Sequence, residues 1–426
     1  MRLAAGKKEQ GKQEKQAGRE AHPREHIRTP AAILRSMPSP HTELPIIRLK
    51  LEVQGRHPRF FRKQIQKPEH PLPPGSLVRV IDRTGRPIGF GFYNSRATSA
   101  LRLISRGKKL AADWLEQRLA TAIDLREKLL RLPRDTDGYR LVHAEGDGLP
   151  GLVIDKLGPA LVAQLSSRGL EQRIEEIGSF LLQRYPGAQL LLSIDPSDRA
   201  REGLSHPGSG PGQPIELSEH GLRYQVVPGG AHKTGFFCDQ RDNRLAIRAY
   251  AKGRRVLDLC CNAGGFAMQA ARAGAKSILA VDLDEEAVAR TRSNARRNKL
   301  KLDVRQADAF DILRGLKKGE HDLLILDPPK WVQQKSEIER GLARYRDLNR
   351  EAFKKCEEGA IVVSCSCSGL VDEGGFIRTV REAAAQARRD VQILSLRGAG
   401  PDHPIALEVP ESRYLKVLTM RVGASG

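Results

Sequence analysis

The segment Val256-Leu-Asp-Leu-Cys-Cys-Asn-Ala-Gly-Gly-Phe266 has the pattern of a buried strand, a glycine-containing turn and the start of a helix. Glycines let a backbone approach a ligand closely, and the free N–H groups of a helix N-terminus attract a carboxylate or a phosphate. The segment therefore predicts a nucleotide-binding turn. Its candidate cofactor-binding residues are Asp258, Gly264, Gly265 and Phe266.

Two further acids follow the next strands of the chain. Asp282 ends the strand Ile278-Leu-Ala-Val, and Asp308 follows the third strand. An acid at the end of the second strand is placed to bind ribose hydroxyls, and Asp308 is placed to face an adenine edge. A capping role is the alternative for each acid taken alone, but three acids in this order favour a cofactor site.

The fingerprint of dinucleotide-binding enzymes, G-x-G-x-x-G, is absent from the turn. Cys260 and Asn262 stand where glycines would be expected. A nicotinamide-dependent hydride-transfer enzyme is therefore the weakest alternative, and a methyltransferase is favoured.

Strands and helices alternate through the last two fifths of the chain. Repeated βαβ units predict an α/β fold with a Rossmann-like, doubly wound sheet and ligands at the carboxyl ends of its strands. We expect the last apolar segment, 414–422, to be the edge strand. The expected strands are 256–259, 277–281, 302–305, 322–326 and 360–364, and the expected helices are 265–273 and 285–298.

The segment Asp327-Pro-Pro-Lys-Trp331 follows an apolar strand, and two prolines force a rigid exit from it. The next strand runs into Cys365-Ser-Cys367. A thiolate that adds to carbon 6 of a pyrimidine makes carbon 5 nucleophilic enough to attack a methyl group. Asp327 is then placed to hydrogen-bond ring N3. Strand alternation puts Cys365 and Cys367 on one face and does not choose between them.

The N-terminal half predicts three further regions. Residues 1–44 have the composition of a disordered basic tail. Residues 45–109 carry short apolar strands, 46–53, 76–81 and 87–93, which predict a small β-barrel. Residues 110–230 predict an α+β domain with helices in 114–131 and 170–184, a hairpin of 149–155 with 160–165, and a loop at 205–214. The methyltransferase-type domain then occupies 231–426.

Charge points to a polyanionic partner. Lys and Arg number 72 and Asp and Glu 51, a net charge of +21. Residues 46–108 hold 14 Lys and Arg against three acids, so about half of the excess lies in the expected barrel. We expect RNA contacts from Arg56, Arg59, Arg62 and Lys63; a solvated basic face is the alternative.

Composition also excludes some classes of protein. No apolar run approaches the ~20 residues that cross a bilayer, and the basic N-terminus lacks the apolar core of a secretory signal, so we expect a cytoplasmic protein without membrane contact. The six cysteines form no CxxC pair and have no histidine pattern near them, which predicts neither zinc nor another metal site and no disulfide framework.

Taken together, the motifs resemble the PUA-domain-containing cytosine-5 ribosomal RNA methyltransferases, of the bacterial 23S rRNA methyltransferase I type. The resemblance covers about residues 46–423. It is carried by several short motifs in order: Gly55-Arg-His-Pro58, Gly146-Asp-Gly-Leu-Pro-Gly151, Lys233-Thr-Gly-Phe-Phe237, Asp239-Gln-Arg241, Asp327-Pro-Pro-Lys330, Ser366-Cys-Ser-Gly369, Asp402-His-Pro404 and Tyr414-Leu-Lys416.

The resemblance implies a PUA RNA-binding barrel, a central α+β domain, and a methyltransferase domain that uses S-adenosyl-L-methionine to methylate ribosomal RNA. It places the nucleophile on Cys367. It also implies a cofactor contact for Gln240 and an RNA contact for Lys330, and a homodimer is one expected assembly. The relatives usually carry an aromatic residue near the position of Asn262, so this turn departs from their pattern.

Two rival functions share these features. A methyltransferase of adenine or guanine amino groups would need no cysteine, but it commonly has an aromatic residue directly after the two prolines, where this chain has Lys330. A non-catalytic RNA-binding or assembly protein would use the basic barrel equally well.

Overall fold

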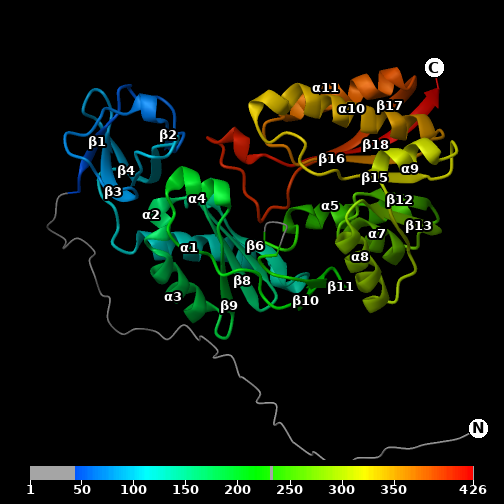
Figure 1. Ribbon diagram of the computed structural model, residues 1–426, viewed down its shortest axis with the longest axis horizontal. Helices are drawn as coiled ribbons and strands as arrows, with labels where there is room; N and C mark the ends of the chain where they lie inside the picture. The colour runs from blue at the N-terminus through cyan, green and yellow to red at the C-terminus, as the bar shows by residue number, and fades with distance from the viewer. Residues whose placement is uncertain (1–43, 231–233, 426) are drawn as a thin grey trace, which may run out of the picture. The chain divides into compact units, whose positions relative to one another are not determined.

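The computed structural model describes residues 44–230 and 234–425 (Figure 1). The expected basic tail and Lys233 lie outside the described residues. None of the described helices is long and apolar enough to cross a membrane.

The first part of the described chain is a five-stranded sheet in the order β1-β3-β4-β5-β2. The expected strands 76–81 and 87–93 are confirmed, whereas the first strand is shorter than expected. Backbone hydrogen bonds Lys50 N to Gln64 O and Gln66 N to Arg48 O bring the two ends of the sheet together, as in a barrel. The strands are β1 Ile46–Arg48, β2 Arg59–Phe60, β3 Ser76–Ile81, β4 Pro87–Tyr93 and β5 Leu101–Arg106.

The middle part is a four-stranded sheet, β6-β7-β8-β9, beside a separate hairpin of β10 and β11. The expected hairpin is confirmed as antiparallel β7 and β8. The first expected helix ends at Asp124 and continues as a π-helical turn, Leu125–Leu129. The strands are β6 Gly138–His143, β7 Leu152–Leu157, β8 Ala160–Leu165, β9 Gln189–Ser193, β10 Ile215–Glu219 and β11 Leu222–Val226, and the helices are α1 Trp114–Asp124, α2 Arg168–Glu171, α3 Ile174–Arg184 and α4 Pro196–Glu202.

The last part is a seven-stranded sheet in the order β14-β13-β12-β15-β16-β18-β17. The first five of these strands are parallel, and β18 is antiparallel to both of its neighbours. The strands are β12 Arg255–Leu259, β13 Ser277–Asp282, β14 Asp303–Gln306, β15 Leu323–Leu326, β16 Ile361–Ser366, β17 Arg389–Arg397 and β18 Lys416–Ser425.

The expectation that the last apolar segment forms the sheet edge is wrong. β18 lies between β16 and β17, and β17 is the edge. The burial of the strands explains the order: β18 has apolar residues buried on both faces, such as Val417 on one face and Leu418 on the other, while Ile393, Leu394 and Leu396 of β17 stay substantially exposed. An apolar strand with both faces buried belongs inside a sheet.

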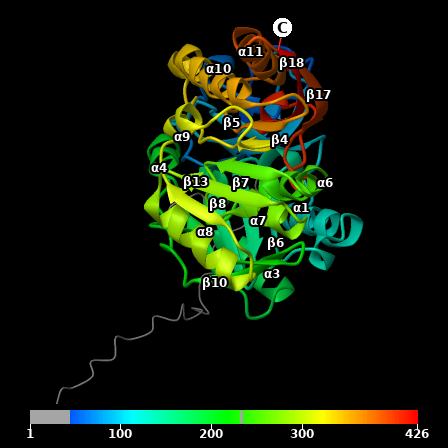
Figure 2. The same cartoon turned by 90° about the vertical axis from the view of Figure 1, so that its right-hand side faces the viewer.

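Helices cover both faces of this sheet (Figures 1 and 2). Alternate residues of the strands face two apolar cores, one shared with α10 and α11 and the other with α7 and α8. The helices are α5 Arg241–Ala246, α6 Arg248–Ala251, α7 Gly265–Arg272, α8 Glu285–Arg297, α9 Ala309–Gly315, α10 Ile338–Lys355 and α11 Glu373–Gln386. The carboxyl ends of β12 and β15 are therefore adjacent where the strand order reverses, which is where such sheets bind ligands.

Candidate active site

A cavity of about 300 Å³ lies at the turn between β12 and α7. Its lining includes Gly265, Phe266, Gln240 and Asp327 among the residues that the sequence predicted. The turn needs left-handed backbone at Gly264, with φ at 77°. A Cβ on Gly265 would lie 2.3 Å from Cδ of Arg244, so the cavity wall is closely packed there.

Arg244 fixes that wall through a buried ion pair. Its Nε and Nη2 donate to the two carboxylate oxygens of Glu219, at 2.8 and 2.5 Å. Both side chains are buried, so this bidentate pair holds Arg244 in one position. The loop before α5 therefore brings Gln240 to the cavity in a fixed orientation.

The three predicted cofactor acids gather around this turn but do not line the cavity. Asp258 accepts a hydrogen bond from Ala267 N at 2.9 Å and so supports the first turn of α7. Asp282 accepts from Asn262 N at 2.8 Å. Asp308 caps α9, which is the capping role that the sequence left open.

The charges on these acids are close enough to influence one another. Burial, and then the acids Asp282, Asp327, Asp258 and Asp308, raise the pKa of the Cys260 thiol. Burial, with Asp327 and Asp282, also raises the pKa of Asp258 to about 8. Four carboxyl groups thus lie near one another at the strand ends, and a cofactor role for Asp258, Asp282 and Asp308 stays a prediction.

The site suits a cationic nucleotide-like cofactor. The buried Oδ1 of Asp258 has no hydrogen-bond partner among the described residues, and an acid cluster of this kind favours a positively charged ligand. The tight glycine turn allows close backbone approach. S-adenosylmethionine carries both an ammonium and a sulfonium group, so the residues present fit it.

Asp327 stands directly after β15, on the wall of the cavity. Gln240 Nε2 donates to its Oδ1 at 3.1 Å. Burial and the neighbouring Asp239 raise the pKa of Asp327 to about 7, although Gln240 partly offsets them. Near neutral pH this carboxyl is therefore available as a proton donor or as an acceptor.

The two candidate cysteines share a face, as strand alternation predicted, but differ in exposure. Cys365 is completely buried in β16, and burial, followed by the charge of Asp327, raises the pKa of its thiol well above the usual range. Cys367 follows the strand and is only partly buried. It is not among the residues that line the 300 Å³ cavity.

A buried polar network, which sequence reasoning missed, supports the site from behind. Arg241 makes two 2.9 Å hydrogen bonds to Asp402, and Tyr414 donates to Asp239 Oδ2 at 2.6 Å. These residues flank Gln240 and join it to the loop before β18. The only available signal was that Asp239-Gln-Arg241, Asp402-His-Pro404 and Tyr414-Leu-Lys416 were motifs in which no residue except Gln240 had an assigned role.

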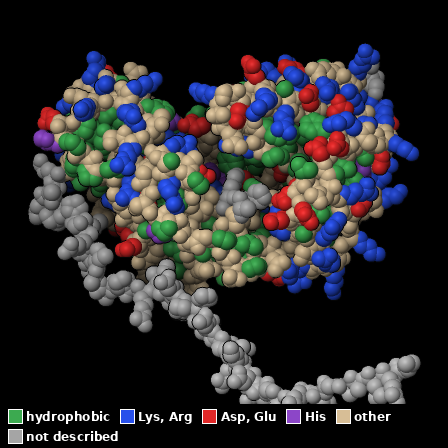
Figure 3. All heavy atoms as spheres, viewed as in Figure 1, with side chains coloured by type: hydrophobic (Ala, Val, Ile, Leu, Met, Phe, Trp, Pro, Cys, Tyr) green, Lys and Arg blue, Asp and Glu red, His purple; other side chains and the backbone are tan. Residues whose placement is uncertain are grey.

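The residues predicted to contact RNA differ in whether they already have a partner within the protein. Arg59 forms an ion pair with Glu145 at 2.5 Å, and Arg62 donates to Arg96 O at 2.7 Å, so both have structural partners. Lys63 and Lys330 are exposed. Figure 3 shows Lys and Arg side chains spread over one face with Asp and Glu among them.

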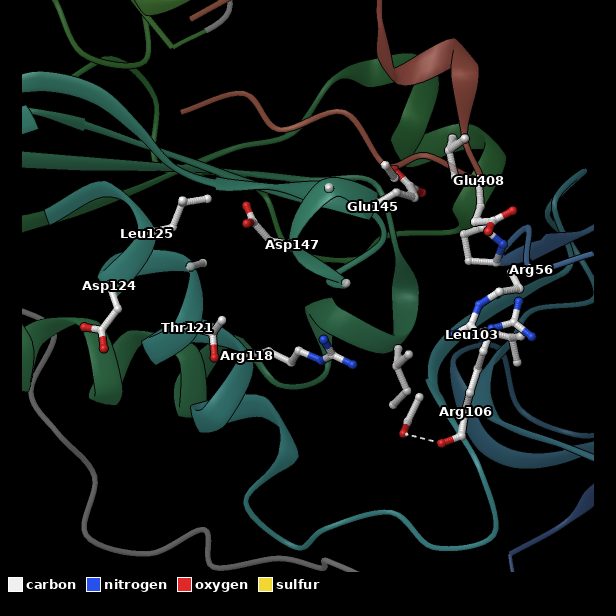
Figure 4. Close-up of a pocket in the computed structure, with 18 of the residues that line it drawn as sticks. Arg56, Leu103, Arg106, Arg118, Thr121, Asp124, Leu125, Glu145, Asp147 and Glu408 are labelled. Atoms are coloured by element: carbon white, nitrogen blue, oxygen red, sulfur yellow. Dashed lines mark hydrogen bonds between the residues drawn. The ribbon is translucent and has the colours of Figure 1, made fainter. Parts of the chain in front are cut away.

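Arg56 lines a second, larger cavity of about 1140 Å³. Residues of the β1–β5 sheet, of α1 with its π-helical turn, and of the loop near Glu408 surround it. Figure 4 shows Arg118 extending from α1 into the space beside the strand that carries Leu103 and Arg106. This cavity contains none of the cofactor-site residues.

Comparison with known proteins defines the class. Residues 190–389 match the family model of S-adenosylmethionine-dependent methyltransferases, and residues 50–106 match a PUA-like domain. A solved structure described as SMU.776, a putative methyltransferase complexed with SAH, superposes with a TM-score of 0.72 at 21% identity, covering 86% of this chain and 95% of that one. A putative methyltransferase from Streptococcus mutans gives 0.70 at 22% identity, covering 85% and 95%. The fold and the site define an S-adenosylmethionine-dependent methyltransferase.

Relatives in sequence identify the family. Ribosomal RNA large subunit methyltransferase I of Aeromonas salmonicida is 36% identical over 378 residues, which cover 86% of this chain and 95% of that protein. The protein of the same name from Tolumonas auensis is 37% identical over 380 residues, covering 86% and 95%. The one from Shewanella denitrificans is 35% identical over 395 residues, covering 88% and 99%. The chain belongs to the ribosomal RNA large subunit methyltransferase I family.

Proposed function

We propose that this protein methylates carbon 5 of a cytosine in large-subunit ribosomal RNA, through a covalent adduct between Cys367 and carbon 6 of the ring. The observation that carries the proposal is the difference between two cysteines at the end of β16. Cys365 is completely buried, whereas Cys367 is partly exposed just beyond the strand. Of these two thiols, Cys367 is the one that a nucleotide can reach.

In the proposed reaction, the Cys367 thiolate forms a bond to carbon 6, and the electrons of the 5,6 double bond make carbon 5 nucleophilic. S-adenosylmethionine, when bound, supplies the methyl group to carbon 5. A base then removes the carbon 5 proton, the double bond re-forms, and the carbon–sulfur bond breaks to release the thiolate. The complete cycle, and no single step of it, returns the enzyme to its starting state.

We assign Asp327 to the ring nitrogen of the cytosine. A carboxyl group whose pKa is about 7 holds its proton in a large share of molecules at neutral pH. A protonated carboxyl can donate to N3 and stabilise the electron density that the ring gains when the thiolate adds. Gln240, bonded to the same carboxyl, orients it.

The environment of Trp331 weighs against the amino-group rival. Its ring packs between Phe310, with centroids 6.4 Å apart, and Tyr345, with centroids 4.7 Å apart. The Arg344 guanidinium lies 5.0 Å from its centroid. A ring held in this way is not free to stack on a flipped base, which is what the rival reaction would require after the two prolines.

We also propose a division of labour among the regions bounded at 45–109, 110–230 and 231–426. The first two bind the RNA and the third methylates it. We infer that the 1140 Å³ cavity takes part of the RNA backbone, because two of the four acids on its wall, Glu145 and Asp147, are already paired with Arg59 and Arg126. Arg56 and Arg118, which form no ion pair with any described residue, then face the incoming phosphates. The expected homodimer stays a prediction, which sedimentation velocity tests.

The decisive experiment replaces Cys367 by Ala and measures methyl transfer to large-subunit RNA from a strain that lacks the gene. We expect no transfer, and bisulfite sequencing of RNA treated with the wild-type protein should reveal one protected cytosine. Cys356→Ala is the matched control, because this buried thiol caps α10 away from the site and its removal should preserve transfer.

RNA that contains 5-fluorocytidine separates the mechanisms. Fluorine at carbon 5 cannot leave as a proton, so the adduct should persist as a covalent protein–RNA complex with the wild-type protein and be absent with Cys367→Ala. Full transfer by Cys367→Ala would overturn the proposal in favour of amino-group methylation. RNA binding without transfer by the wild-type protein would favour an assembly role.

A further inference from the structure

Lys416, the first residue of β18, is a completely buried lysine beside Cys367 in the sheet. Its backbone pairs with Ser366 of β16. Its ammonium nitrogen donates to the carbonyl oxygen of Ser368 at 2.7 Å and to that of Tyr414 at 2.9 Å. Lys416 thus pairs with the residue before Cys367 through its backbone and binds the residue after Cys367 through its ammonium group.

The charge of this lysine is unusual for its surroundings. Both of its acceptors are neutral carbonyl oxygens, and no ion pair between the described residues includes it. Burying an ammonium without an anion costs free energy. Burial accordingly lowers the pKa of Lys416 to about 8, and the first group that acts in the opposite direction is the Cys367 thiolate. At neutral pH the ammonium form still predominates.

We propose that Lys416 is a positioning residue whose buried ammonium holds Cys367 as a thiolate. This inference rests on the proposed nucleophilic role of Cys367. Lys416 keeps its proton throughout: it stabilises the sulfur anion before the bond to carbon 6 forms, and again when that bond breaks and the electron pair returns to sulfur. A neighbouring opposite charge lowers the pKa of a thiol in this way.

Other titratable and charged groups face this pair from the neighbouring strand, helix and loops: Cys365, Tyr345, Asp372, Glu373 and Arg413. Arg413 is paired with Glu373, which offsets its charge. Asp372 caps α11 by accepting from Gly375 N. Among the groups named here, Lys416 is the buried cation that has no ion pair between described residues, and its charge acts on Cys367.

The test measures the thiol itself, without RNA or methyl transfer. The full-length protein is treated with iodoacetamide across pH 5 to 10, and fragment-ion mass spectrometry reports the alkylation rate at Cys367. We expect Lys416→Met to raise the midpoint of the rate profile by about one pH unit or more, so that alkylation near pH 7 slows about tenfold. Lys416→Arg, which keeps the charge, should largely restore the wild-type midpoint.

Tyr345→Phe is the matched control, because it loosens the loop at Ser368 without removing a charge. Tyr345 hydroxyl and Ser368 Oγ are 3.0 Å apart, so this change removes an uncharged tie to the residue that Lys416 holds. We expect lower thermal stability with an unchanged alkylation midpoint. If Tyr345→Phe shifts the midpoint as far as Lys416→Met does, Lys416 acts by holding the loop and the proposal is wrong.

The pH profile of Cys367 alkylation in the wild-type protein tests the proposal even if the Lys416→Met variant does not fold. A midpoint below the usual thiol value of about 8.5 is expected, and a midpoint at or above it would overturn the proposal. The result is separable from the proposed function. Methyl transfer by Cys367→Ala would refute the covalent mechanism whatever the alkylation profile shows, whereas an unshifted profile refutes only the role of Lys416.

Discussion

Replacing Asp402 by Asn should destabilise the protein strongly. Asp402 is completely buried, and its carboxylate accepts from both terminal nitrogens of Arg241 at 2.9 Å and from Arg140 N at 3.0 Å. Burial alone would raise the pKa of Asp402, but His403 and Arg241 outweigh it and hold the pKa far below the usual range. The carboxylate is thus charged in the folded protein at every ordinary pH.

The magnitude follows from the charge that remains. Asn keeps the shape of Asp but leaves the Arg241 guanidinium, only 1% exposed, without its main anion. Removing one partner of a buried pair costs about 3–5 kcal/mol, because the other charge stays desolvated. Asp124→Asn is the matched control: its ion pair with Lys128 is exposed and should contribute at most about 1 kcal/mol.

Urea unfolding followed by tryptophan fluorescence measures both changes, because Trp114 and Trp331 report on different parts of the chain. A double variant, Asp402→Leu with Arg241→Met, should recover much of the loss that Asp402→Leu causes alone, since no unpaired charge remains. If Asp402→Asn lowers the free energy of unfolding no more than Asp124→Asn, the reasoning about the buried pair is refuted.

Three further predictions concern the cavities. The pKa values of Asp258 and Asp327 in the folded chain are about 8 and 7, so between about pH 4 and pH 8 the folded chain binds more protons than the unfolded chain, and its stability should fall as the pH rises. Thermal melts of Asp327→Asn should show a smaller fall in stability over this range. An unchanged fall would contradict the raised pKa of Asp327. Gly265→Ala should weaken S-adenosylmethionine binding at least tenfold in calorimetry, because its Cβ would lie 2.3 Å from Cδ of the ion-paired Arg244. An affinity equal to that of the wild-type protein would show that the Arg244 side chain can move to make room for the added methyl group. Arg118→Gln should reduce the salt dependence of RNA binding by about 0.7–1 in log–log slope, without changing transfer at saturating RNA; an unaltered slope would remove Arg118 from the interface.

Much of the fold is predictable from local pattern. The strands β3 and β4 begin and end as expected, and the parallel strands around Asp258 agree within two residues, because buried strands are short apolar runs bounded by glycines and polar residues. The position of β18 could not be predicted in this way. Strand order depends on which faces find partners, and an apolar run such as 414–422 carries no information about its neighbours.

The site was predictable where chemistry follows strand ends. Asp258, Asp282, Asp308 and Asp327 converge because the carboxyl ends of neighbouring parallel strands meet at one edge. The buried contacts of Lys416 and Asp402 could not be predicted. Their partners, Ser368 and Arg241, are far away in sequence, and a buried lysine or aspartate looks like an exposed one until the fold brings its neighbours to it.

The insertion of β18 between β16 and β17 has a consequence for how the molecule matures. The edge strand β17 pairs only with its successor β18, so it can join the sheet together with β18 or after it, and never before it. The pairing of β18 with β16 also delivers Lys416 to its place beside Ser366. If Lys416 holds Cys367 as a thiolate, as we propose, the Cys367 thiol should therefore gain its low pKa during refolding only when β18 pairs with β16, and no earlier.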